Sequence, residues 1–197
     1  MLGFWHAKAF FLFDCETGGL DPSFSLLTLS GAVLDEQYNV LDSIDLAIKP
    51  SSGRYVLNAK AMEINKINIA AHDAVALPED EAAAQLGIFL AKHSDSGRAR
   101  LVPAGHNVRL DLNFAEKLLP DFGKYALHRS HDTAAIASFC QDFGLIPESC
   151  NLSLPALCSH LNIDPTGIHD AKVDIELTRR VMKGLFDLLI DYGSSCQ

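Results

Sequence analysis

The sequence predicts one α/β domain built around a mixed sheet. Its first half opens with three strand-like segments in succession, as in an antiparallel meander. Its second half alternates helical and strand-like segments. No internal repeat, low-complexity tract or interdomain linker divides the 197 residues, which suffice for one substantial hydrophobic core.

The strands are predicted from apolar runs. Phe10–Asp14 begins with four consecutive apolar residues, which is typical of a strand covered on both faces. The segments Leu26–Leu34 and Val40–Ile48 complete the meander. Two later segments, Arg100–Ala104 and Leu127–Ser130, bring the predicted sheet to five strands.

The helices are predicted from capping signals and apolar periodicity. Pro78 and the three acids that follow it suit a first turn, where proline fits and negative charge opposes the helix dipole. In the last helix, apolar residues recur every four positions from Val173 to Leu185, and Asp170 is its expected N-cap. The predicted helices cover about 58–64, 78–93, 110–118, 133–143, 154–161 and 170–192. We expect 1–192 to form the domain and 193–197 a frayed tail.

The composition argues against several classes of protein. The apolar run 9–13 is too short to span a bilayer, and no segment reads as a targeting peptide. The cysteines are five in number and form no CxxC pair, so we expect reduced thiols in a cytoplasmic chain. The histidines and cysteines lack the spacing of a zinc site. A net charge of −9 argues against tight nonspecific binding to nucleic acid.

Charge is distributed unevenly along the chain. Residues 9–48 contain acids but no Lys or Arg, whereas basic residues outnumber acids over 92–129. A second basic group consists of Lys172, Arg179, Arg180 and Lys183. An acidic pole beside a basic stretch fits a metal centre with a phosphate-binding flank, and solvated surface charge explains most of these residues individually at least as well.

Three short stretches carry the candidate site residues. Residues 14–18 read DCETG, residues 106–111 read HNVRLD and residues 169–174 read HDAKVD. Asp14 and Glu16 are two apart on a strand end, so their side chains share a face. Carboxylates gathered at one point repel one another unless they share cations. The stretches therefore imply a divalent metal and phosphoryl chemistry.

Each of these residues also has an ordinary structural explanation. Asp111 falls in a first helical turn, where an acid is favoured by the dipole, and Asp174 could simply face solvent. His106 and Asn107 could be loop caps. His169 is a loop histidine, although imidazole titrates near neutrality and can take a proton from a polarised water. No single residue decides the matter, but together they match one known pattern in chain order.

That pattern resembles the DEDDh branch of the DnaQ-like 3′→5′ exonucleases. The residues that carry it are Asp14-x-Glu16-Thr17-Gly18, His106-Asn107-x-x-x-Asp111 and His169-x-Ala171-x-x-Asp174, with Asp132-Thr133 between the second and third motifs. The resemblance spans nearly the whole chain. It implies a ribonuclease H-like fold, with a five-stranded mixed sheet flanked by helices.

The resemblance also implies a mechanism, hydrolysis of phosphodiester bonds with release of 5′-mononucleotides. By it, Asp14, Glu16, Asp111 and Asp174 bind two Mg²⁺ or Mn²⁺ ions, with Asp111 acting partly through water. His169 is then the general base.

Further residues would bind the substrate. Thr17, Gly18 and the adjacent backbone would receive the terminal 3′-hydroxyl, and His106 and Asn107 would also contact the strand. Leu20 matches the position of an apolar wedge against the terminal bases, and a leucine packed on the core is an equally good interpretation.

The substrate is left open by the sequence. Residues 16–22, ETGGLDP, look more like the DNA-directed members, so the 3′ end of single-stranded DNA is the preferred interpretation. The alternatives are an RNA-directed exonuclease of the RNase T or oligoribonuclease type and a proofreading subunit with a polymerase or replication partner. A noncatalytic binding module is least favoured, because all five DEDDh residues are present. No residue can be identified that reads a 2′-hydroxyl, and nothing indicates the oligomeric state or pathway.

Overall fold

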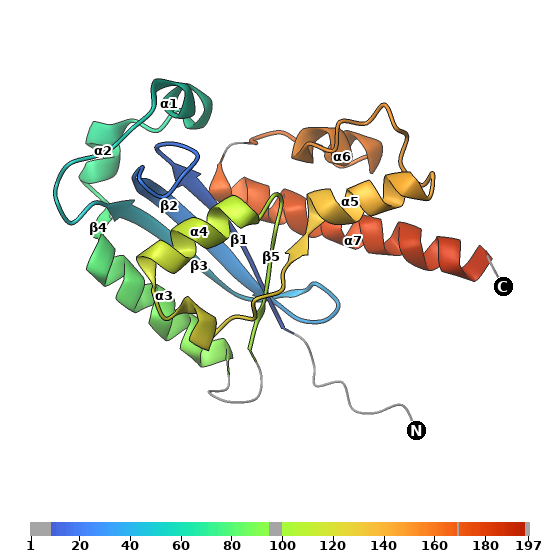
Figure 1. Cartoon of the computed structure of the whole chain (residues 1–197), viewed down its shortest axis with the longest axis horizontal. Helices are drawn as coiled ribbons and strands as arrows, with labels where there is room; N and C mark the ends of the chain where they lie inside the picture. Colours follow the sequence, from blue (N-terminus) through green and yellow to red (C-terminus); the bar gives the residue numbers. More distant parts are fainter. Residues whose placement is uncertain (1–8, 95–99, 169, 196–197) are drawn as a thin grey trace.

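The computed structural model describes residues 9–94, 100–168 and 170–195 (Figure 1). They form a mixed sheet of six strands in the order β4-β3-β2-β1-β5-β6, with helices on both sides. The α/β class and the antiparallel meander are confirmed. The prediction of five strands is wrong by one.

Strand β1 lies inside the sheet and joins its antiparallel and parallel parts. β1 (Phe10–Thr17), β2 (Leu26–Leu34) and β3 (Val40–Lys49) are the predicted meander. β5 (Val102–Gly105) pairs parallel to β1, and β6 (His131–Asp132) pairs parallel to β5. The chain reaches these two strands through helical connections, as parallel pairing requires.

Two short strands differ from the prediction. The unpredicted strand, β4 (Leu77–Pro78), pairs with the end of β3, and two residues are too few to show a period. The last strand is β6 rather than Leu127–Ser130; before it, only Ala126 bridges to Leu101 among the described residues. Both positions depend on pairing with a distant strand, which local sequence does not encode.

Most helices lie where capping and periodicity predicted them. Asn58 caps α1 and Asp132 caps α5 through their side-chain oxygens. The helices are α1 (Ala59–Asn65), α2 (Ile69–Asp73), α3 (Glu79–His93), α4 (Arg109–Leu118), α5 (Thr133–Asp142), α6 (Leu154–His160) and α7 (Ala171–Ser195), with a 3₁₀ turn η1 (Phe122–Lys124). The short α2 was not predicted. α7 continues through 193–195, where the sequence suggested a frayed tail.

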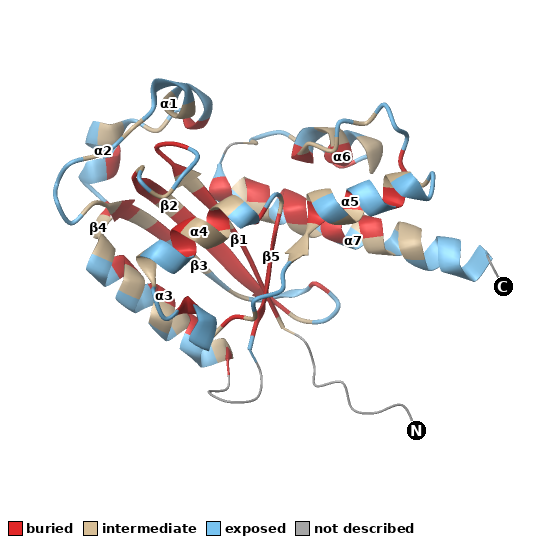
Figure 2. Cartoon of the chain, in the orientation of Figure 1, coloured by how far each residue is buried: buried red, intermediate tan, exposed pale blue. Residues whose placement is uncertain are grey.

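Alternate residues of β1 serve two different cores. Phe11 and Phe13 pack with residues of α3 and α4 on one face of the sheet. Phe10 and Leu12 pack with Met182 of α7 on the other face. Figure 2 shows the buried residues concentrated in the central strands and on the helix surfaces that face them. The even-numbered row of β1 therefore runs along the side covered by α7.

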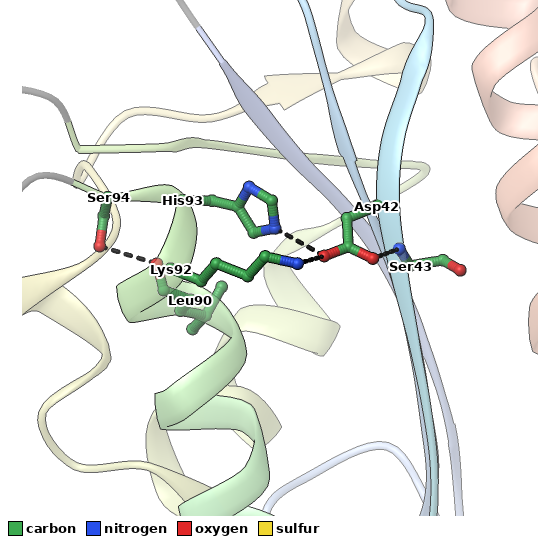
Figure 3. Close-up of polar contacts among 6 residues, drawn as sticks. All are labelled: Asp42, Ser43, Leu90, Lys92, His93 and Ser94. Carbon is green, nitrogen blue, oxygen red and sulfur yellow. Dashed lines mark hydrogen bonds and ion pairs between the residues drawn. The ribbon is translucent and has the colours of Figure 1, made fainter.

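The end of α3 is tied to the open edge of the sheet by Asp42 of β3 (Figure 3). Its Oδ2 accepts hydrogen bonds from Lys92 Nζ at 2.7 Å and His93 Nε2 at 2.8 Å. Both hydrogen bonds lower the pKa of the Asp42 carboxyl, and the bond to Lys92 has the larger effect. The cluster links α3 to β3, and none of its residues belongs to the three predicted motifs.

Two predictions from composition concern the described residues. None of their helices is both long and apolar enough to cross a membrane. Cys15, Cys140, Cys150 and Cys158 are free thiols, as predicted, while Cys196 lies outside the described residues.

Candidate active site

Three of the predicted carboxylates lie together at the junction of β1 and α7. Asp14 and Glu16 lie opposite Ser30 and Thr28 of β2, on the face covered by α7. Asp174 projects from the first turn of α7. One oxygen from each of Asp14, Glu16 and Asp174 lies within 4.8 Å of the other two. Such a set of hard oxygen ligands suits a divalent cation.

The N-terminus of α7 is held by a local cap. Asp170 Oδ1 accepts from the backbone N–H groups of Lys172 at 3.0 Å and Val173 at 3.3 Å, as the sequence predicted for an N-cap. The Asp174 N–H donates to the Asp170 carbonyl at 2.9 Å. Leu177 and Val181, farther along the helix, are buried and anchor α7 to the domain. The cap and this apolar face together direct Asp174 toward β1.

Asp111 approaches β1 from α4, beside the group of three. It lies in the first turn of α4 and is 5% exposed. Its Oδ1 accepts a hydrogen bond from the Cys15 N–H at 2.9 Å. The three-carboxylate group does not include Asp111, and its predicted action through water stays a prediction.

The pKa values of these carboxyls are raised first by burial and then by the negative charges of their neighbours. Burial, followed by the charge of Asp174, raises the pKa of Asp14 to about 7. Burial, followed by the charges of Asp14 and Asp174, raises the pKa of Glu16 to about 8. Burial and the charge of Asp14 likewise raise the pKa of Asp111 well above its ordinary value. A bound cation would remove this repulsion, so the site fits a divalent metal.

The turn after β1, which follows Glu16 directly, packs closely against the segment around Val56. Gly18 N–H donates to Ser25 O at 2.8 Å, and a Cβ on Gly18 would lie 2.4 Å from Val56 O. Only glycine therefore fits there. Thr17 Oγ1 donates to Gly19 O at 2.7 Å. The adjacent Leu20 is 83% exposed, so it does not pack on the core and is available to a ligand.

His106 and Asn107 are fixed by the start of α5. Thr133 Oγ1 lies 3.3 Å from Gly105 O, to which it donates, and 2.8 Å from His106 Nδ1. We therefore assign the ring proton to Nδ1, which leaves Nε2 as an acceptor. Burial lowers the pKa of His106. The Asn107 N–H donates to Asp132 Oδ1 at 2.9 Å, with Asn107 in a left-handed conformation (φ 55°).

Asp132 and Thr133 were not among the predicted site residues, although the Asp-Thr pair was visible in the sequence. The structure shows that this pair orients the second motif. Asp132 Oδ1 serves Asn107 and also caps α5 by accepting from Ala134 N at 3.0 Å. His169, the predicted general base, lies outside the described residues.

A cavity of about 410 Å³ lies beside the carboxylates and was not predicted. Glu16 belongs to its wall, as does Lys66 from the turn after α1. The remaining lining residues come from β2, β3, the end of α1 and the turn after it, and the start of α7, and they include Thr28, Ser30, Asp45, Asn65, Asp170 and Lys172.

Comparisons with known proteins agree with this geometry. A family model described as exonuclease matches residues 11–182. A structure of exonuclease I aligns with a TM-score of 0.73 and 21% identity, covering 94% of this chain and 44% of that chain. Escherichia coli exonuclease I in complex with a dT13 oligonucleotide gives 0.73 and 21%, with 94% and 43% covered. A complex of exonuclease I with SSB-Ct gives 0.71 and 20%, with 93% and 43% covered.

The chain thus spans less than half the length of these solved structures. No curated protein sequence matches it. At this identity the structural likeness establishes the fold, while the family match extends over most of the chain and contains all three motifs. The chain belongs to the exonuclease family.

Proposed function

We propose that this chain is a metal-dependent exonuclease that removes 5′-mononucleotides from the 3′ end of single-stranded DNA. The observation that carries the proposal is the group of Asp14, Glu16 and Asp174, with oxygens within 4.8 Å of one another. Their mutual repulsion supports a cationic cofactor, and the family match supports the exonuclease reaction.

Asp14, Glu16 and Asp174 would hold the cofactor. Asp111, which is hydrogen-bonded to the N–H of Cys15, would also act on the metal, partly through water. Two divalent ions, Mg²⁺ or Mn²⁺, would neutralise the phosphodiester charge and lower the pKa of the attacking water. The residues present fit such ions, because carboxylate oxygens are the ligands that both prefer.

The remaining residues would place the strand and move the proton. Thr17 and Gly18 would receive the 3′-hydroxyl, and the exposed Leu20 would pack against the terminal bases. His106 offers Nε2 to the strand, because Thr133 occupies Nδ1. His169 would accept the proton of the attacking water. The bond from phosphorus to the 3′-oxygen of the preceding nucleotide then breaks.

Single-stranded DNA is the proposed substrate because E. coli exonuclease I has been solved with dT13 and dA16 oligonucleotides. Its fold is shared by this chain over 93–94% of the residues. The complex of exonuclease I with SSB-Ct supports a search for a replication-associated partner as well.

The test is a digestion panel with Asp14→Asn as the inactive variant. Single-stranded DNA, duplex DNA and RNA, each labelled at the 5′ end, are incubated with Mg²⁺, Mn²⁺ or EDTA. We expect stepwise shortening of single-stranded DNA from its 3′ end, no reaction in EDTA, and at least about a hundredfold loss of rate in Asp14→Asn. Asp121→Asn, an exposed surface change, is the matched control.

Equal activity of Asp14→Asn and the parent protein would remove the three-carboxylate group from the mechanism. Faster digestion of RNA than of DNA would replace the proposed substrate while leaving the reaction class in place.

A further inference from the structure

Thr28 of β2 lies directly across the strand pair from Glu16. The two residues are register partners of the antiparallel β1–β2 pair, so their side chains share the face that α7 covers. Side chains at directly opposite positions have Cβ atoms about 5 Å apart. Both residues also belong to the wall of the cavity beside the carboxylates. The hydroxyl of Thr28 is therefore a near neighbour of a carboxylate of the proposed metal site.

The Thr28 hydroxyl is enclosed by the protein and, among the described residues, has no hydrogen-bond partner. A buried hydroxyl without a partner destabilises a fold, and most buried polar groups are therefore paired. Valine has nearly the same shape, carries no such cost and is favoured in strands. The enclosed hydroxyl at this position points to a partner that the fold alone does not supply.

Glu16 is the matching acceptor. Within the part of the chain that the structure describes, no donor forms a hydrogen bond to its carboxylate. Asp111 and Asp170, by contrast, accept from backbone N–H groups. A carboxylate that ligates a metal is usually oriented by a hydrogen-bond donor, and loss of such a donor weakens metal binding. Glu16 therefore needs a donor to serve as a well-ordered ligand.

The other side-chain donors in the cavity wall are engaged elsewhere, exposed or differently placed. Asn65 Nδ2 donates to a backbone carbonyl of β1 at 3.2 Å, and Lys172 Nζ pairs with a carboxylate of β3 at 3.0 Å. Lys66 is exposed, and Ser30 lies opposite the other carboxylate of β1. This leaves the hydroxyl of Thr28 as the donor for the carboxylate directly across the strand pair.

We propose that Thr28 is a positioning residue of the metal site, which donates a hydrogen bond from Oγ1 to Glu16 when a divalent cation is bound. Rotation about the Cα–Cβ bond of Thr28 moves the hydroxyl between staggered positions, so the contact requires no movement of the backbone. The bond would hold the Glu16 carboxylate in place for the cation and raise the affinity for metal. This inference rests on the proposed metal-dependent function and adds a residue to its metal site.

The experiment measures the melting temperature in EDTA and the apparent Kd for Mn²⁺ in Thr28→Val, Thr28→Ser and the parent protein. Without metal, Thr28→Val should melt at or above the temperature of the parent protein, because it removes a buried polar group that has no partner. Its apparent Kd, obtained from melting at increasing Mn²⁺, should be about tenfold weaker. Thr28→Ser retains the hydroxyl and should bind Mn²⁺ within about threefold of the parent protein.

A defect of packing would lower both the melting temperature and the metal affinity. The opposite directions expected for Thr28→Val therefore identify the hydroxyl as the cause. Equal Mn²⁺ affinity in Thr28→Val and the parent protein would overturn the inference. So would a lower melting temperature of Thr28→Val in EDTA, or a loss of affinity in Thr28→Ser as large as that in Thr28→Val. A parent protein that binds no Mn²⁺ would instead overturn the proposed function.

Discussion

Asp14 and Glu16 carry negative charge into a partly buried position where their pKa values rise to about 7 and about 8. Their ordinary values are 3.8 and 4.5. At pH values between the ordinary and the raised pKa values, the folded protein without metal therefore binds more protons than the unfolded chain. Stability therefore falls as pH rises through this range. Burial lowers the pKa of His106, an opposite effect confined to pH values below about 6.5.

We accordingly expect the metal-free protein to melt several degrees lower at about pH 8.5 than at about pH 6.5. Differential scanning fluorimetry in EDTA measures this change. Asp14→Asn should show a shallower dependence, because it removes one member of the repelling group. A melting temperature that rises over this interval would contradict the assignment of raised pKa values.

At the scale of the element, the N-cap of α7 positions Asp174 as well as stabilising the helix. Asp170→Ala should lower the free energy of unfolding by about 1 kcal/mol, the usual contribution of a cap. It should also reduce kcat by more than this instability explains, because the first turn that carries Asp174 loosens. Ser153→Ala, which removes the side-chain cap of α6, is the control for stability alone. Equal kcat values in the two variants would show that Asp170 has no positioning role.

The elements also show what local sequence encodes. The helix starts at Asp132 and Asp170 were predictable, because each cap is made by its own side chain. β1 runs three residues beyond the predicted end at Asp14. Its last residues include the polar Glu16 and Thr17, and they are held in the strand by pairing with β2 rather than by an apolar run of their own. The short β4 and the displaced β6 depend on pairing with distant strands, and their own residues show no period.

On the scale of the whole molecule, three distant motifs were predicted to form one site. In the structure, Asp174 of α7 joins the carboxylates of β1, and Asp111 of α4 is hydrogen-bonded to the same strand. Their chain order made this predictable without a fold. Lys66 and the cavity were not, because they depend on how the turn after α1 packs against the sheet.

Metal binding should couple the site to global stability. Since the unfolded chain cannot assemble the carboxylates, Mn²⁺ should stabilise the folded protein by about 2.7 kcal/mol at a concentration of about a hundredfold its Kd. Thermal melting with increasing Mn²⁺ measures this shift, and Asp14→Asn is the control that should respond weakly. An equal shift in both proteins would place the bound metal elsewhere.

The hydrogen bond from the Cys15 N–H to Asp111 limits where the domain can accept insertions during evolution. Asp14 and Glu16 lie on the side of β1 covered by α7, and the peptide nitrogen between them holds the helix on the opposite side. Strand β1 thus sets the distances among the carboxylates that come from the helices on both faces of the sheet. Insertions in segments that are exposed and lie away from β1, α4 and α7, such as the turn at residues 51–53 after β3, should be tolerated without loss of catalysis.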